Sequence, residues 1–366
     1  MNRPGSVLVV ATQRIGDVLL ATPLIRSLRQ AWPQAALDAL VFEGTEGVIA
    51  ANPDLRRVLS VPRRPRVLEH ALFIARLLRR YDMALSVLAG DRPTLYAFFA
   101  GRWRAGMLVP GRKEAWKRRL LNRWVPFDDV NTHTVAMNLA LADLVGVPRS
   151  GEVVISWSAE DEQRVSQVLG DGAGERVAVL HVFPKYHYKM WRPEAWREVG
   201  SWLVDHGFHL ALTGSADAAE LAYVDSIARA MPAGTINAAG KLSLGASACL
   251  VHHAQVFVGP DTAMTHVAAA LGVPTIAIYG PTNPIKWGPW PRNQAPDINP
   301  WRRCGTQQVG NVFLVQGSGA CVPCHFEGCE RHVLSYSDCL QTLAAGTVIK
   351  AVEAALGGGF RADRGR

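Results

Sequence analysis

The chain has 366 residues, of which 49% are apolar and 19% are charged. This length and composition are typical of a globular protein with about two domains and sizeable cores, which excludes a disordered chain. No apolar run reaches the roughly 18 residues of a membrane span, and the apolar stretch before Arg14 is too short for a signal peptide. We therefore expect a cytoplasmic protein.

The net charge of +8 is distributed unevenly along the chain. Residues 1–150 hold 22 Lys and Arg against 12 Asp and Glu, a balance of +10, whereas residues 151–366 have a balance of −2. A basic first half suggests an anionic partner there: nucleic acid, lipid headgroups or a phosphorylated glycolipid. A solvated, arginine-rich surface would give the same composition.

The first half is predicted to be a βα series. Residues 7–11 form a fully apolar run, typical of a buried parallel strand, and a turn with Gly and Asp17 leads into a helix over 18–32. The G-x-G-x-x-G pattern of a dinucleotide site is absent. An aspartate at a helix start is often a cap, but it also suits a general base. Further strands are expected at 37–41 and 84–88.

The second half is predicted to be a second such series, after a linker at 150–175. A strand at 177–181 is followed by a loop that contains Lys189, and a strand at 210–213 ends in the turn Thr213-Gly214, with Glu220 in the next helix. A loop lysine is usually solvated, yet here Lys189 could act as a point charge toward an anion.

The most informative stretch is 256–284, which reads as strand, turn, helix, strand and turn. Asp261 or Thr262 is expected to cap the helix with its side-chain oxygen, and Gly272 ends it. Ligands bind at the carboxyl ends of parallel strands, where helix amides face anions. An ordinary βαβ unit and a buried structural histidine remain alternatives, but several polar groups could converge there: Thr262, Ala263, His266, Thr282 and Asn283.

Four of the six cysteines lie within 19 residues, with spacings that approximate a metal site: Cys321, Cys324, Cys329 and Cys339. Structural zinc or iron, a cluster of reduced thiols, and oxidised pairs are all open interpretations. A last helix is expected over 337–356.

Three motifs resemble one family. Arg14-Ile-Gly-Asp-Val-Leu-Leu-Ala-Thr-Pro23, Lys189-x-Trp191, and Asp261-Thr-Ala-x-x-His266 with a later Tyr-Gly-Pro-Thr-x-Pro284 are similar to motifs of family 9 glycosyltransferases, the bacterial heptosyltransferases. The resemblance implies an α/β fold of the GT-B type, with two Rossmann-like domains whose parallel sheets face each other across a cleft. The implied parts are an acceptor domain (1–157), a donor domain (175–335) and the final helix.

The resemblance also assigns roles to residues. Asp17 matches the general base, and Lys189 matches the lysine at the sugar-phosphate of the donor. The remaining donor-binding positions are Thr213, Gly214, Glu220, Asp261, Thr262, Ala263 and His266. At Ala263 the family often has glycine, so a methyl group is expected close to the diphosphate.

The implied activity is an inverting transfer of heptose from ADP-heptose to a phosphorylated lipopolysaccharide core, at the cytoplasmic face of the inner membrane and without nucleic acid. Because the chain has no Asp-x-Asp motif, no cofactor is expected in catalysis. Trp287-Gly-Pro-Trp290 and the cysteine segment favour the third type of core heptosyltransferase. Open alternatives are a protein or other glycan as acceptor, a nucleic-acid-binding protein with a zinc knuckle, and a nucleotide-sugar epimerase.

Overall fold

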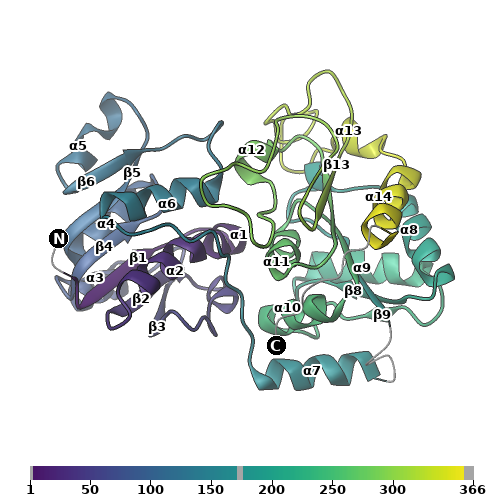
Figure 1. Ribbon diagram of the computed structural model, residues 1–366, viewed down its shortest axis with the longest axis horizontal. Coiled ribbons are helices and arrows are strands. Elements are labelled where there is room, and N and C mark those ends of the chain that lie inside the picture. The colour runs from purple at the N-terminus through teal and green to yellow at the C-terminus, as the bar shows by residue number, and fades with distance from the viewer. Residues whose placement is uncertain (1–2, 171–175, 358–366) are drawn as a thin grey trace. The chain divides into compact units, whose positions relative to one another are not determined.

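The computed structural model describes residues 3–170 and 176–357, which fold as two compact units (Figure 1). The first unit runs to Ser156 and includes Gln294–Asn299; the second comprises Trp157–Asn293 and the chain from Pro300 on. The short segment 294–299 joins the first unit because Arg149 Nη1 pairs with Asp297 Oδ1 at 2.9 Å. Residues 171–175 of the expected linker lie outside the described residues.

The first unit is built on a six-stranded parallel sheet with the order β3-β2-β1-β4-β5-β6. This order, with helices between successive strands, is that of a Rossmann-like series. Its elements are β1 (Ser6–Val10), α1 (Ile15–Leu19), α2 (Thr22–Ala31), β2 (Ala36–Phe42), η1 (Glu46–Val48), β3 (Arg57–Val61), α3 (Val67–Leu77), β4 (Tyr81–Ser86), α4 (Asp91–Ala100), β5 (Gly101–Leu108), η2 (Arg112–Glu114), α5 (Ala115–Arg118), β6 (Arg123–Pro126) and α6 (Thr134–Leu144).

The helix expected over 18–32 is instead two helices, α1 and α2, that meet at Leu20 and Ala21. Pro23 lies in the first turn of α2, where the backbone N–H has no partner within the helix, so proline loses no hydrogen bond there. In the middle of one continuous helix, the same proline would remove a backbone hydrogen bond. The Thr22 hydroxyl donates to Leu19 O at 2.7 Å and accepts from the amide of Val154 at 2.9 Å, which holds the break.

The second unit is built on a seven-stranded sheet with the order β12-β13-β11-β10-β7-β8-β9, in which only the edge strand β12 is antiparallel to its neighbour. Its elements are α7 (Ala159–Leu169), β7 (Val177–His181), η4 (His187–Lys189), α8 (Pro193–Asp205), β8 (His209–Thr213), α9 (Ala218–Ala230), β9 (Ile236–Asn237), α10 (Leu244–His253), β10 (Val256–Pro260), α11 (Ala263–Leu271), β11 (Thr275–Tyr279), α12 (Pro284–Trp287), β12 (Gln307–Val309), β13 (Val312–Gln316), α13 (Asp338–Gln341) and α14 (Ala345–Gly357).

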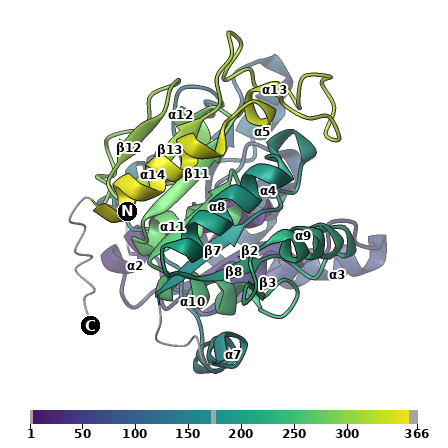
Figure 2. The same ribbon diagram turned by 90° about the vertical axis from the view of Figure 1, so that its right-hand side faces the viewer.

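Apolar side chains cover both faces of this sheet, because every second residue of a strand points to the same face. One face packs against α8 and α14, which lie side by side in front of the strands in Figure 2. Trp191 and Trp196 meet edge to face there, and the Trp191 indole N–H donates to Leu343 O at 3.0 Å. The other face packs residues such as Ala269 and Trp301.

Two further boundaries differ from expectation. The last helix is broken into α13 and α14, since the chain turns at Thr342 after α13. Helix α7, expected in the linker, belongs to the second unit: the Asp161 carboxylate accepts from the Ser243 hydroxyl at 2.5 Å and Arg164 donates to Lys241 O at 3.0 Å. Within the ranges 3–170 and 176–357, no helix has the length and apolar character needed to cross a bilayer.

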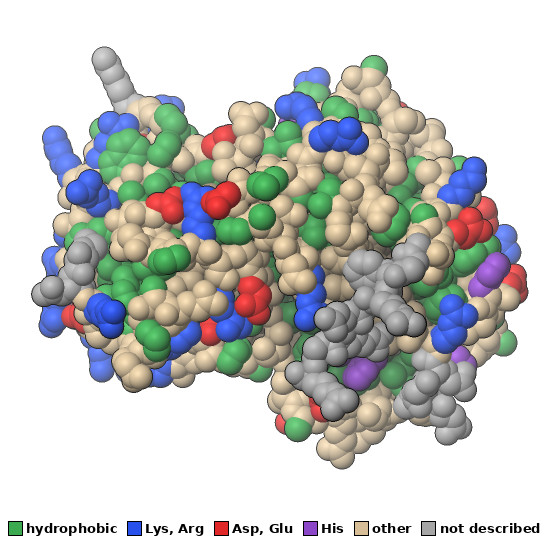
Figure 3. Space-filling model, in the orientation of Figure 1, with side chains coloured by type: hydrophobic (Ala, Val, Ile, Leu, Met, Phe, Trp, Pro, Cys, Tyr) green, Lys and Arg blue, Asp and Glu red, His purple; other side chains and the backbone are tan. Residues whose placement is uncertain are grey.

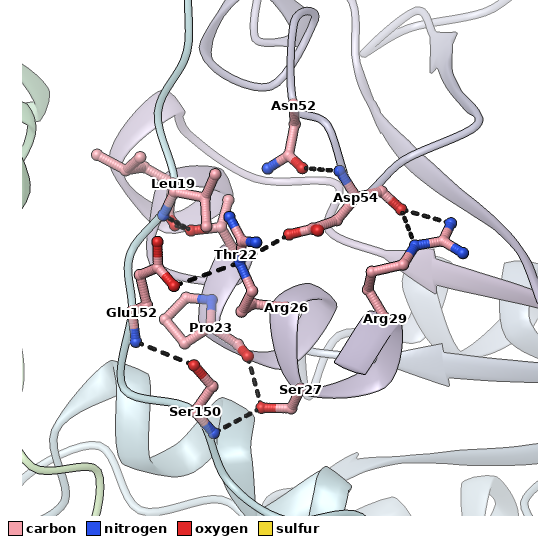
Figure 4. A network of polar contacts seen from close by, with 11 residues as sticks. Leu19, Thr22, Pro23, Arg26, Ser27, Arg29, Asn52, Asp54, Ser150 and Glu152 are labelled. Carbon is pink, nitrogen blue, oxygen red and sulfur yellow. Dashed lines mark hydrogen bonds and ion pairs between the residues drawn. The ribbon is translucent and has the colours of Figure 1, made fainter. Parts of the chain in front are cut away.

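A polar network fixes α2 in the first unit (Figure 4). Asp54, only 3% exposed, pairs with Arg26 Nε at 3.0 Å, while the Arg29 guanidinium donates twice to the Asp54 carbonyl at 3.0 and 2.7 Å. The Ser27 hydroxyl accepts from the amide of Ser150 at 2.9 Å. Burial raises the pKa of Asp54, and the two arginines act against that rise. The network thus holds a buried carboxylate under α2, the helix that follows Asp17.

Replacing Arg26 with Met should destabilise the protein by about 2–4 kcal/mol, because the Asp54 carboxylate would stay buried without its ion-pair partner. Chemical denaturation at pH 7 measures this. The matched control is Arg66→Met, since the Arg66 side chain is 88% exposed and its ion pair with Glu69 spans 4.0 Å. Equal stabilities of the two variants would contradict the structural role of the network.

Candidate active site

The sheet of the second unit brings the predicted donor residues to one edge. Strands β7, β8, β10 and β11 are parallel neighbours, so their carboxyl ends lie together. Lys189 follows β7, Thr213 ends β8, and Asp261 directly follows β10. Three segments that are distant in the sequence therefore supply one site.

At the centre of this edge, Lys189 Nζ contacts Asp261 Oδ2 at 2.5 Å. The carboxylate also accepts from the Tyr279 hydroxyl at 3.3 Å and from Thr282. The side chains of Lys189 and Asp261 are 19% and 8% exposed, so the pair is largely shielded from water. The nearby Lys185 is exposed and lies over the ring of Tyr186 instead, so Lys189 is the lysine that belongs to this edge.

The charge on Asp261 is maintained by its neighbours. Burial alone would raise the pKa of this carboxyl, but Lys189, His266 and the hydrogen bond from Thr282 outweigh burial and hold its pKa below the usual value. The ammonium group of Lys189 has three N–H donors, of which Asp261 uses one. The ammonium group therefore has donor capacity beyond this ion pair.

His266 lies one turn into α11 and is buried. Burial lowers the pKa of its imidazole to about 4, against a smaller opposing effect from Asp261. The ring is therefore neutral at pH 7. Its Nδ1 atom is buried and has no hydrogen-bond partner among the described residues. A neutral ring with an unused nitrogen at a ligand-facing helix start is suited to a hydrogen bond with a bound molecule.

The N-cap side chain of α11 makes no capping hydrogen bond. Thr262 is the N-cap residue with extended backbone (φ −141°, ψ 170°), but its side chain does not cap the helix. The expected capping bond from Asp261 or Thr262 is thus absent, because Asp261 is engaged by Lys189 and the Thr262 hydroxyl lies 3.4 Å from that of Thr265. Thr262 and Ala263 are only half-buried. First-turn amides left uncapped by a side chain can hold a phosphate.

The turn after β8 lies beside a second set of polar groups. The Thr213 hydroxyl is 3.0 Å from His181 Nδ1, and the Ser215 hydroxyl donates to Glu220. Gly214 lies so close to Glu220 that an added Cβ would sit 3.2 Å from Glu220 Oε1. A larger residue at position 214 would therefore have to displace neighbouring side chains by a few tenths of an ångström.

Asp17 lies in the first unit. It is in the first turn of α1, which follows β1, so it stands at the carboxyl edge of the first sheet. The residue is half-buried. Arg63, which follows β3, donates to Gln13 O at 3.3 Å, so a second strand end adds positive charge to the same edge. Asp17 belongs to the first unit, and the predicted donor residues belong to the second.

Sequence reasoning missed one residue of the donor edge. Tyr279 was named only as the first residue of the Tyr-Gly-Pro-Thr-x-Pro284 motif and was given no role, yet its hydroxyl contacts Asp261 and donates to Trp287 O at 2.8 Å. Its position was the available signal, since the last residue of a parallel strand lies at the ligand edge. Asn283 caps α12 by accepting from the amide of Ile285, so it organises the turn.

The four clustered cysteines lie in the segment that leads into α13 and in α13 itself. Burial raises the pKa of the Cys339 thiol to about 12, and the nearby Cys324, Cys329 and Cys321 contribute to the rise. Among the residues described, no three His, Cys, Asp or Glu side chains are arranged to hold one ion. Cys329 Sγ instead accepts from the amide of Asp338 at 3.3 Å, while Cys339 packs into the core. A structural zinc or iron site stays a prediction here, beside a cluster of reduced thiols and oxidised pairs.

The buried His266 should make stability fall in acid. Its pKa is about 4 when folded against 6.5 for the free side chain, so between these values the unfolded chain binds more protons. As the pH falls from 6.5 to 4, the wild type should lose about 3 kcal/mol relative to His266→Asn. Urea denaturation across this window measures the difference. If the free energy of unfolding changes with pH equally in the two proteins, the pKa of the His266 ring is not lowered in the folded state.

Comparisons with known proteins agree with this geometry. The family model for glycosyltransferase family 9 (heptosyltransferase) matches residues 74–307, well over half of the chain. Lipopolysaccharide heptosyltransferase 3 of Escherichia coli is 26% identical over 294 residues, covering 76% of this chain and 84% of that protein.

Two solved structures share the fold. The family 9 glycosyltransferase of Veillonella parvula has a TM-score of 0.77 at 18% identity and covers 97% of each chain. The ADP-heptose lipopolysaccharide heptosyltransferase II of E. coli has a TM-score of 0.75 at 19% identity, covering 96% of this chain and 99% of that one. The likeness confirms the predicted pair of Rossmann-like α/β units. The chain belongs to glycosyltransferase family 9, the heptosyltransferases.

Proposed function

We propose that this heptosyltransferase transfers heptose from ADP-heptose to a sugar of the lipopolysaccharide core, with inversion at the anomeric carbon. The observation that carries the proposal is the Lys189–Asp261 pair beside the N-terminus of α11, in a chain of this family. The similarity to lipopolysaccharide heptosyltransferase 3 supports this acceptor class and the third type of core heptosyltransferase.

The donor diphosphate binds at the start of α11. The first-turn amides and the ammonium of Lys189 both face this point, and each favourable helix-end contact is worth about 0.3–2 kcal/mol. Several such contacts are needed to hold a diphosphate. Asp261 fixes the Lys189 side chain, and the neutral ring of His266 offers its unused Nδ1 atom to a hydroxyl of the donor. The Ala263 methyl group limits how closely the diphosphate approaches the helix.

The nucleoside binds at the neighbouring strand end, against Thr213 and Gly214. Glu220, oriented by the Ser215 hydroxyl, accepts a hydrogen bond from a ribose hydroxyl. A carboxylate is suited to this contact because it only accepts when ionised.

In the reaction, the Asp17 carboxylate takes the proton of the acceptor hydroxyl. The freed oxygen forms a bond to the anomeric carbon from the face opposite the diphosphate. The bond between that carbon and the phosphate oxygen breaks, and ADP leaves with the electron pair. Lys189 and the α11 amides stabilise the charge that develops on the leaving phosphate, so the step uses fixed protein charges and needs no cofactor.

The acceptor binds to the basic edge of the first unit. Arg63 and Arg14 lie on the loops that follow β3 and β1, near Asp17. A phosphorylated core would be held there by charge, which agrees with the surplus of +10 in residues 1–150. Since such an acceptor is anchored in lipid, we place the enzyme at the cytoplasmic face of the inner membrane.

Incubation of the purified enzyme with ADP-heptose and a heptose-deficient core tests the proposal. Mass spectrometry should show a core heavier by one heptose, and NMR of the product should show the inverted anomeric configuration. A product with retained configuration would overturn the single displacement. Consumption of ADP-heptose without acceptor would indicate an epimerase or hydrolase, and transfer to a protein would replace the core as acceptor.

Replacing Asp17 with Asn should lower kcat by about 10²–10⁴, because the amide cannot accept the acceptor proton. The Kd for ADP, measured by calorimetry, should stay unchanged, since Asp17 lies in the other unit from the donor edge. Full activity of the variant would remove Asp17 from the proposed role.

Replacing Lys189 with Met should weaken ADP binding and lower kcat together, each by about tenfold or more, because the lysine contacts the diphosphate before and during departure. The matched control is Lys185→Met, in the same loop but exposed, and should behave like the wild type. If both variants lose ADP affinity and kcat to the same extent, the loop acts through its overall charge and Lys189 makes no specific contact.

A further inference from the structure

Helix α3 of the first unit exposes an apolar face that the fold does not use. Val67 and Leu68 are 88% and 73% exposed, the highest values among the large hydrophobic residues in the described ranges, and Leu72 is 53% exposed. Ala71 and Ala75 are exposed as well, one before Leu72 and one a turn after Ala71. These five residues, Val67, Leu68, Ala71, Leu72 and Ala75, are called the α3 face below.

The opposite side of α3 anchors the helix firmly. His70 Nε2 lies 2.9 Å from the Tyr96 hydroxyl, and the ring of Phe73 meets the Tyr96 ring edge to face with 6.1 Å between centroids. Ile74 and Leu77 pack into the same core. The helix is therefore held by one side, and its solvent side carries leucine and valine where a soluble helix normally carries polar residues.

Positive charge surrounds the α3 face at both ends. Arg64 and Arg66 precede the helix, Arg76, Arg79 and Arg80 lie at its last turn and just beyond, and the only carboxylate between residues 63 and 80 is Glu69. All of these arginines are exposed. In Figure 3, lysine and arginine side chains are spread among apolar ones over the part of the surface formed by the first unit.

The loop before α3 also connects this face to the edge that carries Asp17. Arg63 donates to Gln13 O at 3.3 Å, in the loop before Asp17, and Arg92 donates to the carbonyls of Arg63 and Pro62 at 2.6 and 2.7 Å. The start of α3 is thus fixed beside the acceptor edge. Whatever the α3 face rests on will lie next to that edge.

We propose that the α3 face docks on a bilayer that contains anionic lipids. Aliphatic side chains enter the boundary between headgroups and acyl chains, and the flanking arginines contact lipid phosphates, which is the arrangement of interfacial helices. A second copy of the chain is a poorer occupant, because a symmetric contact would bring the arginines of one copy against those of the other. A protein partner is also disfavoured, since the face lacks the aromatic anchors that dominate such interfaces.

This inference rests on the proposed function only for the orientation of the bound enzyme. Docking through α3 would set the acceptor edge close to the lipid surface, where a lipid-anchored core begins. The binding itself depends on apolar area and charge alone. It can therefore be measured without donor or acceptor, so that its failure is distinct from a failure of transfer.

The test is flotation of the full chain with vesicles of phosphatidylcholine, alone or mixed with phosphatidylglycerol. Wild type should float with the mixed vesicles and much less with phosphatidylcholine alone. Leu68→Ser with Leu72→Ser should lower the partition coefficient at least about tenfold. Arg64→Ala with Arg66→Ala should lower it about fivefold per arginine, and high salt should abolish this arginine effect.

The matched control is Ile298→Ser, because Ile298 is 63% exposed in the same unit but lies away from α3 in the sequence. It should float like wild type, and all variants should keep the wild-type circular dichroism and turnover of a water-soluble acceptor. The proposal is overturned if the leucine variant floats normally. It is equally overturned if that variant loses self-association on gel filtration while vesicle binding is unchanged, which would assign the face to a second copy.

Discussion

The donor edge depends on one buried ion pair, Lys189 with Asp261. Removing either partner would leave the other charge in a poorly hydrated place, which typically costs 3–5 kcal/mol. Asp261 directly follows β10, and Lys189 lies in the loop after β7, so the pair also ties two neighbouring strand ends together. The interaction thus keeps Lys189 pointing at the start of α11, and it engages the carboxylate that would otherwise cap that helix.

The same edge carries two kinds of hydrogen-bonding groups. Lys189 and the first-turn amides of α11 are hydrogen-bond donors, whereas the neutral ring of His266 has an unused Nδ1 atom. Burial sets this division, because it favours the uncharged imidazole while the adjacent Lys189 keeps Asp261 ionised. A nucleotide sugar presents phosphate oxygens and hydroxyl donors close together, so the arrangement complements such a ligand.

The first unit has an unusual surface on helix α3. Its sheet is typical of a Rossmann-like series, yet α3 leaves aliphatic side chains in solvent and surrounds them with arginines. Such a face is costly in water, because exposed apolar area lowers solubility and invites association. It is consistent with an enzyme that meets its acceptor at an anionic lipid surface.

The sequence by itself determined the fold class and the general location of the site. Apolar runs such as 7–11 and 256–258 are short and lack a helical period, which is typical of buried parallel strands. Asp261 lies in the turn after one such run, and Lys189 lies in the loop after another. The sequence could not determine the contacts between side chains from different strands. These contacts depend on the order of the strands in the sheet, which local residue spacing does not show. Only the structure decided that Asp261 binds Lys189 and Tyr279 in place of capping α11. Likewise, whether an apolar helix side such as that of α3 is buried depends on what packs against it.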